Sequence, residues 1–142
     1  MPNRYVVSVG TGNSSGSTVD LVSVTAGSCG LTLRRLELSF SPTTLSSSNV
    51  QASFSLTRGS VTGGSALTVN PVQESNPVSA LATAKFGATT SGTTLLNWYV
   101  SGAYEVDFEG SNGVTAVSGD ALTLSFSAPG TNSIAANLYF EE

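Results

Sequence analysis

The feature that most constrains the fold of this chain is a repeat of apolar residues at every second position. Successive side chains of a β-strand point to opposite faces, so this period indicates half-buried strands. Clusters of Gly, Ser, Asn and Pro bound the runs, as turns do. The chain is therefore predicted to be all-β, with about nine or ten strands at the spacing of a sandwich or barrel. The clearest runs are Tyr5/Val7/Val9, Val50/Ala52/Phe54/Leu56, Leu67/Val69, Tyr104/Val106/Phe108, Leu122/Leu124/Phe126 and Ile134/Ala136/Leu138/Phe140.

Two segments depart from this pattern. Residues 78–85 (VSALATAK) contain good helix formers, although an extended, Ala-rich strand fits them equally well. Residues 70–77 (NPVQESNP) contain two prolines, so they are not a central strand and are predicted to cross the surface. The length of 142 residues suits one domain. We expect a sandwich over residues 17–142, preceded by a strand or arm at residues 1–16.

The composition limits what the surface can do. Only 10% of the residues are charged and the net charge is −4, which argues against a nucleic-acid partner. About 41 residues are Ser or Thr, so hydroxyl groups must cover much of the surface. The first residues lack the apolar core of a signal peptide, and no stretch reaches the length of a membrane span. We expect a protein made in a cytoplasm, with no membrane partner.

The stretch LTLRRLELSF predicts an irregularity within one strand. Leu31 and Leu33 share one parity, whereas the apolar residues after the two arginines share the other. A one-residue bulge at Arg34–Arg35 would place all the apolar side chains on one face. Arg34 and Arg35 are candidates for bidentate pairs with carboxylates across an interface. The simpler expectation is that they pair with Glu37 or face solvent.

The stretch LLNWYV carries bulky side chains on both faces of its strand. Trp98 and Leu96 are predicted to face one way, with Tyr99 and Leu95 facing the other. One aromatic ring could then contact another molecule, or the Tyr could extend its hydroxyl to water at a sheet edge. Trp98 and Tyr99, together with Arg34, Arg35 and Arg58, are our interface candidates.

Three carboxylates alternate with apolar residues in YEVDFEG, at Glu105, Asp107 and Glu109. Carboxylates two residues apart on a strand are roughly 6.5–7 Å apart, too far for all three to bind one ion. Glu105, Asp107 and Asp120 remain weak metal candidates if Asp120 folds nearby. Otherwise these acids lie in water while Tyr104, Val106 and Phe108 face the core.

Other chemistry finds little support in the sequence. The chain has no histidine, which removes the commonest general base and metal ligand. Its many serines lack a base apart from Lys85, and no Ser-x-x-Lys spacing surrounds that lysine. The single cysteine, Cys29, excludes an internal disulfide and is expected to lie inert near a turn. We therefore expect no enzyme activity and no cofactor.

Several stretches together resemble a family of small tailed-bacteriophage head proteins. They are LTLRRLELSF, then ASFSLTRGSVTGGSALTVNPVQESNPVSALATAKFGATT, and the closing NSIAANLYFEE. Their layout over roughly residues 30–142 is similar to that of jelly-roll decoration, or cement, proteins on the outside of capsids. The resemblance implies an antiparallel β-sandwich with jelly-roll connections, homotrimers, and binding to the major capsid protein.

This resemblance also implies a mechanism and a location. The protein would lie on the outer surface of the virion and bridge neighbouring capsid subunits, with many weak contacts adding through avidity. Surfaces rich in Ser and Thr pack against neighbours without the desolvation cost of charges. The proline-rich segment and residues 1–16 would contact the capsid. On that expectation, deleting residues 1–16 would abolish capsid binding and leave the fold intact.

Other function classes remain open from the sequence. A phage fibre or receptor module that binds carbohydrate would use an exposed aromatic platform, for which Trp98 and Tyr99 are the candidates. A pilin subunit would need a leader and is disfavoured by the lone cysteine. A glycoside hydrolase would need paired carboxylates in a cleft, usually lined with aromatic residues.

Overall fold

The computed structural model describes residues 3–13, 18–42, 52–73, 78–100, 103–107, 113–128 and 132–142. Every regular element in these residues is a β-strand, so the all-β prediction is confirmed. No helix among them is long and apolar enough to cross a membrane. The strands are β1 (Arg4–Asn13), β2 (Val19–Thr25), β3 (Leu31–Pro42), β4 (Ala52–Thr62), β5 (Ser65–Leu67), β6 (Asn70–Pro71), β7 (Thr83–Phe86), β8 (Thr89–Val100), β9 (Ala103–Asp107), β10 (Val114–Ala116), β11 (Ala121–Ser127) and β12 (Asn132–Glu141).

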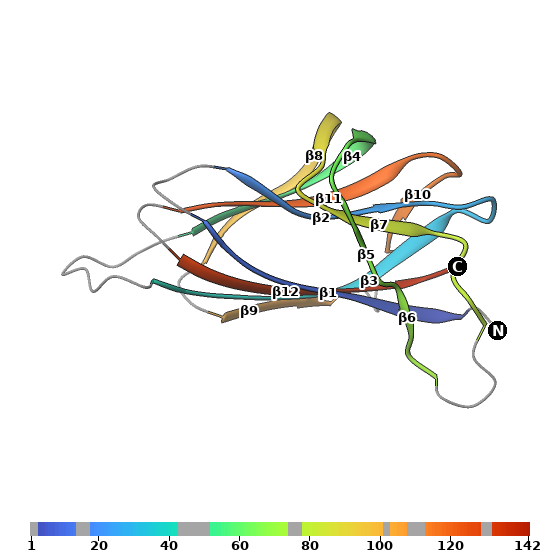
Figure 1. The fold of residues 1–142 in the computed structure, drawn as a ribbon, viewed down its shortest axis with the longest axis horizontal. Helices are drawn as coiled ribbons and strands as arrows, with labels where there is room; N and C mark the ends of the chain where they lie inside the picture. The colour runs from blue at the N-terminus through green and yellow to red at the C-terminus, as the bar shows by residue number, and fades with distance from the viewer. Residues whose placement is uncertain are drawn as a thin grey trace.

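The strands form two antiparallel sheets that pack face to face (Figure 1). Sheet A has the order β10-β3-β12-β1-β6, and β9 also pairs with β3. Sheet B has the order β5-β7-β2-β11-β4-β8. In Figure 1, β12, β1, β3 and β9 run through the lower layer, while β2 and β11 lie in the upper layer.

The strand order is that of a jelly roll. The body consists of two four-stranded arrays, β9-β3-β12-β1 and β2-β11-β4-β8. The chain changes sheet between β1 and β2, between β2 and β3, and between β3 and β4. It changes again between β8 and β9 and on either side of β11. This nested winding gives the double Greek key of a jelly roll, so the predicted jelly-roll sandwich is confirmed.

The core lies between the sheets and takes the alternating apolar side chains of both. Aromatic rings occupy its centre, where Phe126 contacts Phe40 and Phe54 with ring centroids 5.6 and 5.0 Å apart. Tyr5 stacks on Phe140 at 5.4 Å between strands β1 and β12. These rings and the surrounding Leu and Val side chains are almost completely buried. Because apolar burial stabilises by about 25 cal/mol per Å², these side chains provide the main driving force for folding.

The predicted bulge in β3 is present. Tyr139 of β12 lies opposite Arg35, whereas the next residue, Phe140, lies opposite Leu33, so Arg34 is the extra residue. The shift brings Leu31 and Leu33 to the same face as the later apolar residues of the strand, and all of them are buried. The apolar pattern thus fixed the bulge, because a regular strand would have pointed two leucines into water.

The first strand belongs to the body of sheet A. β1 lies between β12 and β6, and its Tyr5, Val7 and Val9 are buried in the core. The two ends of the described chain meet, because Asn3 and Glu142 exchange backbone hydrogen bonds of 3.2 and 3.1 Å (Figure 1). Deleting residues 1–16 would remove this strand. The structure therefore argues against the expectation that the fold survives that deletion, because three core side chains would be lost.

The chain between β4 and β8 includes the segment for which helix and strand were both open. Residues 78–82 form no helix, and β7 follows at Thr83–Phe86, so the extended alternative is confirmed. The Glu142 carboxylate accepts hydrogen bonds from the backbone N–H groups of Leu81 and Ala82, at 2.7 and 3.0 Å. The Tyr5 hydroxyl donates to the Val78 carbonyl at 3.0 Å. These contacts hold an irregular segment against the sandwich. Within the proline-rich segment, β6 pairs only at the edge of sheet A, and residues 74–77 lie outside the described residues.

A polar cluster joins β8 to the outer side of sheet B. The Asp20 carboxylate accepts hydrogen bonds from the hydroxyls of Thr90 and Ser125, at 3.0 and 2.7 Å. The Thr123 hydroxyl, which is fully buried, donates to Ser23 at 3.0 Å. Because buried polar groups are costly without partners, these bonds fix where the start of β8 crosses β2 and β11.

Candidate functional site

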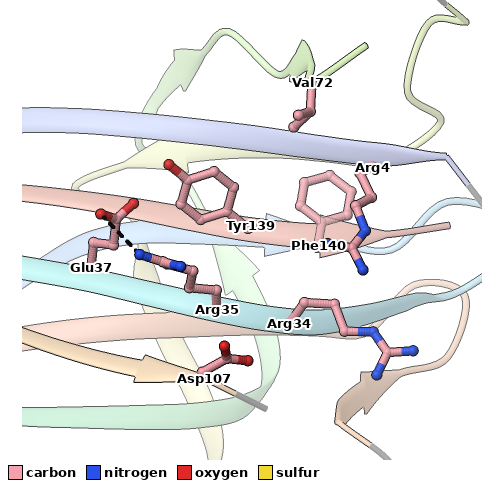
Figure 2. Close-up of a pocket in the computed structure, with 8 residues that line it drawn as sticks. All are labelled: Arg4, Arg34, Arg35, Glu37, Val72, Asp107, Tyr139 and Phe140. Atoms are coloured by element: carbon pink, nitrogen blue, oxygen red, sulfur yellow. Dashed lines mark ion pairs between the residues drawn. The ribbon is translucent and has the colours of Figure 1, made fainter. Parts of the chain in front are cut away.

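The predicted interface arginines of β3 lie on the outer side of sheet A, among charged groups from four strands. We call this cluster the arginine face; Figure 2 shows most of its side chains. Outward-pointing residues of β1, β3, β9 and β12 supply it, because the inward-pointing residues of these strands fill the core. Its members are Arg4, Arg34, Arg35, Glu37, Glu105, Asp107, Tyr139 and Glu141.

Glu141 organises one end of the arginine face. Its carboxylate accepts from Nε of Arg4 at 2.9 Å and from Nε of Arg34 at 3.1 Å. The Glu141 side chain is only 9% exposed, against 50% for Arg4 and 25% for Arg34. Two guanidinium groups from strands on either side of β12 thus converge on one buried carboxylate. Arg34 pairs here and not with Glu37, which corrects the simpler sequence expectation. Sequence reasoning missed Glu141, although its outward parity after Phe140 was a usable signal.

Arg35 organises the other end. Its Nη2 lies 2.8 Å from Glu105 of the neighbouring strand. The same nitrogen lies 3.7 Å from Glu37 (Figure 2), so pairing with Glu37 is confirmed for this arginine. The Arg35 guanidinium also lies 6.0 Å from the centroid of the Tyr139 ring. The Tyr139 hydroxyl donates to Glu37, and this bond, followed by burial, raises the pKa of the tyrosine above its usual 10.0. Tyr139 therefore stays neutral and keeps donating well into alkaline solution.

The structure does not bring the metal candidates together. Glu105 is paired with Arg35, and Asp107 lies opposite Arg35 across the β3–β9 pair. Asp120 lies in the turn after β10, where its carbonyl accepts from the N–H of Ala26. Among the described residues there is no group of three His, Cys, Asp or Glu that could hold a metal ion. Phe108 and Glu109 lie outside the described residues.

A depression of about 530 Å³ opens on the arginine face. Arg4, Arg34 and Arg35 line it together with apolar surface from Val72, which is exposed at the end of β6 (Figure 2). In Figure 2 the guanidinium groups of Arg4 and Arg34 extend away from Arg35. Arginine beside apolar surface is a common composition at protein interfaces, so the depression suits the side chains of another protein.

Trp98 and Tyr99 lie on β8, in the other sheet, and point to opposite sides of it. Trp98 lies opposite Phe54 and stacks on that ring at 6.1 Å, partly buried against the core. Tyr99 lies opposite Ser53 on the outer side and is 69% exposed. The predicted opposite orientation is confirmed for these two rings, so they do not form one flat platform.

A bulge interrupts β8 just before these aromatic residues. Leu56 of β4 lies opposite Leu96, whereas Thr57 lies opposite Thr94, which leaves Leu95 as the extra residue. Leu95 packs against the core, while Leu96 remains 39% exposed. The predicted shared side of Leu96 and Trp98 agrees with the register, because they lie opposite the buried Leu56 and Phe54. The prediction that Leu95 faces outward with Tyr99 was wrong, because the bulge turns Leu95 toward the core.

Arg58, the remaining interface candidate, is part of the β4–β8 ribbon. It lies opposite Thr93 on one side and the buried Leu122 on the other. Its Nε is buried and has no hydrogen-bond partner among the described residues. Arg58 is far along the sheet from Trp98 and belongs to the opposite sheet from Arg34 and Arg35. The five interface candidates therefore do not form a single site: only Arg34 and Arg35 share a surface.

Comparisons with known proteins assign this chain to no family. No protein-family model matches the sequence, and no curated protein matches it. One similar solved structure is the VP2 subviral particle of infectious bursal disease virus, with 12% sequence identity and a TM-score of 0.28. The alignment covers 99% of this chain and 41% of that chain, so the chain spans less than half of its length. A TM-score this low carries no argument, and the jelly-roll assignment depends on strand order alone.

Proposed function

We propose that this chain is a viral structural protein, a decoration protein that binds the outer surface of a tailed-phage capsid. It acts by binding alone, without enzymatic chemistry or a cofactor. In this role it bridges neighbouring major capsid subunits and stabilises the shell against the pressure of packaged DNA. The resemblance of residues 30–142 to this family motivates the assignment, and the jelly roll is a fold that capsid proteins use.

One structural observation carries the proposal. The sandwich exposes two surfaces of different character on its two sheets: the charged arginine face on sheet A and the uncharged strand β8 in sheet B. A protein that bridges others must contact at least two molecules at once, which separate surfaces permit. We assign the arginine face to the capsid protein, because ionic contacts fix orientation and choice of partner.

The test uses particles that lack the protein. Purified protein is added back, the particles are heated, and DNA release is followed with an intercalating dye. We expect the wild-type protein to raise the release temperature, and Arg35→Gln to bind with lower occupancy. Lys85→Gln is the matched control, because it removes one positive charge from sheet B, away from the arginine face.

Two outcomes would contradict the proposal at different levels. Equal release temperatures with and without bound protein would remove the stabilising role while leaving a surface-display role. Equal occupancy of Arg35→Gln and Lys85→Gln would show that the arginine face is not the capsid contact.

A receptor-binding or carbohydrate-binding module is the second candidate function. It is favoured by the exposed ring of Tyr99, which could stack on a sugar. It is disfavoured by Trp98, whose ring stacks on Phe54 from the inner side of the sheet. A glycan array separates the two functions: binding that is lost in Tyr99→Ala would favour the recognition module, and no binding would favour decoration.

A further inference from the structure

We propose that β8 pairs edge to edge with β8 of a second copy of this chain. The two strands run antiparallel about a two-fold axis at Trp98, so that sheet B continues from one molecule into the next. This inference concerns self-association and does not depend on capsid binding.

The outer edge of β8 is available for pairing. β8 ends the order of sheet B, and among the described strands it pairs only with β4. Alternate backbone N–H and C=O groups of an edge strand point away from its own sheet, where they can pair with another strand. Such an edge is a template for strand addition unless the sequence blocks it.

Apart from residues 7–13 of β1, which pair only with β12, the other edges at the ends of the described sheets are short or carry blocking residues. β8 is neither short nor blocked. β5 and β10 have three residues each, and β6 has two, one of them Pro71. β9 has five residues and carries Glu105 and Asp107. β8 has twelve residues without a proline, and the sequence has no charge between Lys85 and Glu105. Charge and proline protect edges from unwanted pairing, so their absence over this length marks β8 as an interface.

The half of β8 after its bulge is the part suited to pairing. The bulge at Leu95 interrupts the edge, and the preceding residues 89–94 are only Thr, Ser and Gly. Residues 96–100 (LNWYV) instead offer bulky side chains to both sides of the sheet. In this half Leu96 and Tyr99 are exposed, which leaves apolar surface for a partner to cover.

When the two-fold axis passes through Trp98, the second copy covers these side chains. Leu96 then lies opposite Val100 of the second copy, and Asn97 lies opposite Tyr99. The two Trp98 residues face each other on the inner side, which extends the apolar layer begun by Phe54 and Trp98. Opposed residues of antiparallel strands lie close enough for aromatic and aliphatic pairs to stabilise the sheet.

The uncharged edge favours a second copy as the occupant. Each chain has a net charge of −4, so two copies repel wherever their charged faces meet. β8 lies within nineteen consecutive residues without charge, residues 86–104, where this repulsion is weak. A two-fold contact also needs only one self-complementary surface, and the apolar residues at 96, 98 and 100 are symmetric about Trp98.

The first experiment measures solution mass by light scattering over a range of protein concentrations. We expect a dimer that dissociates on dilution, and a monomer for Tyr99→Lys, because two added charges would lie beside the axis. Thr94→Lys is the matched control: it adds the same charge to an exposed position of β8, before the bulge, and should remain dimeric. Circular dichroism verifies that both variants keep the β-sheet fold.

The second experiment tests the register. In a Cys29→Ser background, Asn97→Cys combined with Tyr99→Cys places each new thiol opposite one of the second copy. Opposed residues are within the Cα range of disulfides, so we expect oxidation to give a covalent dimer. Tyr99→Cys alone should not cross-link, because the two thiols would lie two residues apart along the strands.

The mass measured by light scattering decides between the possible assemblies. A monomer at all concentrations, or a Tyr99→Lys variant as associated as the wild type, would overturn the pairing. The homotrimer implied by the family resemblance would also overturn it, because three copies cannot share a two-fold axis. A wild-type hexamer that becomes a trimer in Tyr99→Lys would support both the β8 pairing and the homotrimer implied by the resemblance. Capsid binding is scored separately, so failure here leaves the proposed function standing.

Discussion

The arginine face and the β8 edge show two opposite uses of charge in one small sandwich. On the arginine face, three arginines lie among four carboxylates and are held by ion pairs across neighbouring strands. Along β8, nineteen consecutive positions, residues 86–104, carry no charge. The first surface is ordered by pairs within the molecule. The second leaves backbone groups and apolar side chains for a neighbour, so the chain concentrates its few charges where they fix geometry.

The largest effect is expected from Gly92→Ala in the β4–β8 ribbon. A Cβ on Gly92 would collide with the Arg58 carbonyl oxygen. A Cβ on the facing Gly59 would collide in the same way with the backbone of Ser91. The two strands would have to separate, which we expect to cost about 3 kcal/mol of unfolding free energy. Urea denaturation measures this change.

Gly10→Ala is the matched control in sheet A, the sheet that carries the arginine face. No atom lies within 4 Å of a Cβ placed on Gly10 of β1. We expect unchanged or slightly raised stability, because alanine restricts the unfolded chain. Equal losses in the two variants would show that the close approach of β4 and β8 is not what requires glycine at position 92.

A smaller effect is expected from Glu141→Gln, which tests how far the arginine face depends on its buried carboxylate. The amide keeps the shape but leaves Arg4 and Arg34 without their anion. Loss of a partner from a buried pair costs several kcal/mol, and the partial exposure of both arginines reduces this to about 2 kcal/mol.

Glu105→Gln is the control for that variant, because its pair with Arg35 is more exposed. We expect a loss below about 1 kcal/mol, which high salt would diminish further. If both variants lose the same stability in urea, burial of Glu141 would not distinguish the two ends of the face.

The smallest effect is expected in alkaline solution. Hydrogen bonding to Glu37 and burial raise the pKa of Tyr139 above 10.0, so the folded state holds this proton more tightly than the unfolded state. The stabilisation is complete below pH 10 and is lost as the pH rises through the folded-state pKa. Unfolding free energies of Tyr139→Phe should therefore fall less steeply above pH 10 than those of the wild type.

Tyr5 provides an internal comparison in the core. Burial is the main cause that raises its pKa, and its hydroxyl also donates to Val78. It therefore contributes to the same alkaline loss, and Tyr5→Phe should also flatten the profile. An unchanged slope in Tyr139→Phe would contradict the role given to the Glu37 bond.

The sequence alone determined the features that depend on local alternation. The period of two predicted the strands, and the parity change around Arg34 predicted the bulge of β3, because misplacing Leu31 and Leu33 would expose two leucines. The opposite orientation of Trp98 and Tyr99 followed from the same geometry. The jelly-roll order came from a family resemblance, since alternation carries no information on which strands become neighbours.

Tertiary structure decided everything that joins residues far apart in the chain. Arg4 and Glu141 are 137 positions apart and meet only because β1 pairs with β12. Arg34 turned to Glu141 and not to Glu37 because the bulge and the strand order placed that carboxylate beside it. The bulge at Leu95 was not predicted, since leucines on both parities gave no signal of it. Long-range pairing is set by how two sheets together bury their apolar faces, and no local pattern encodes that outcome.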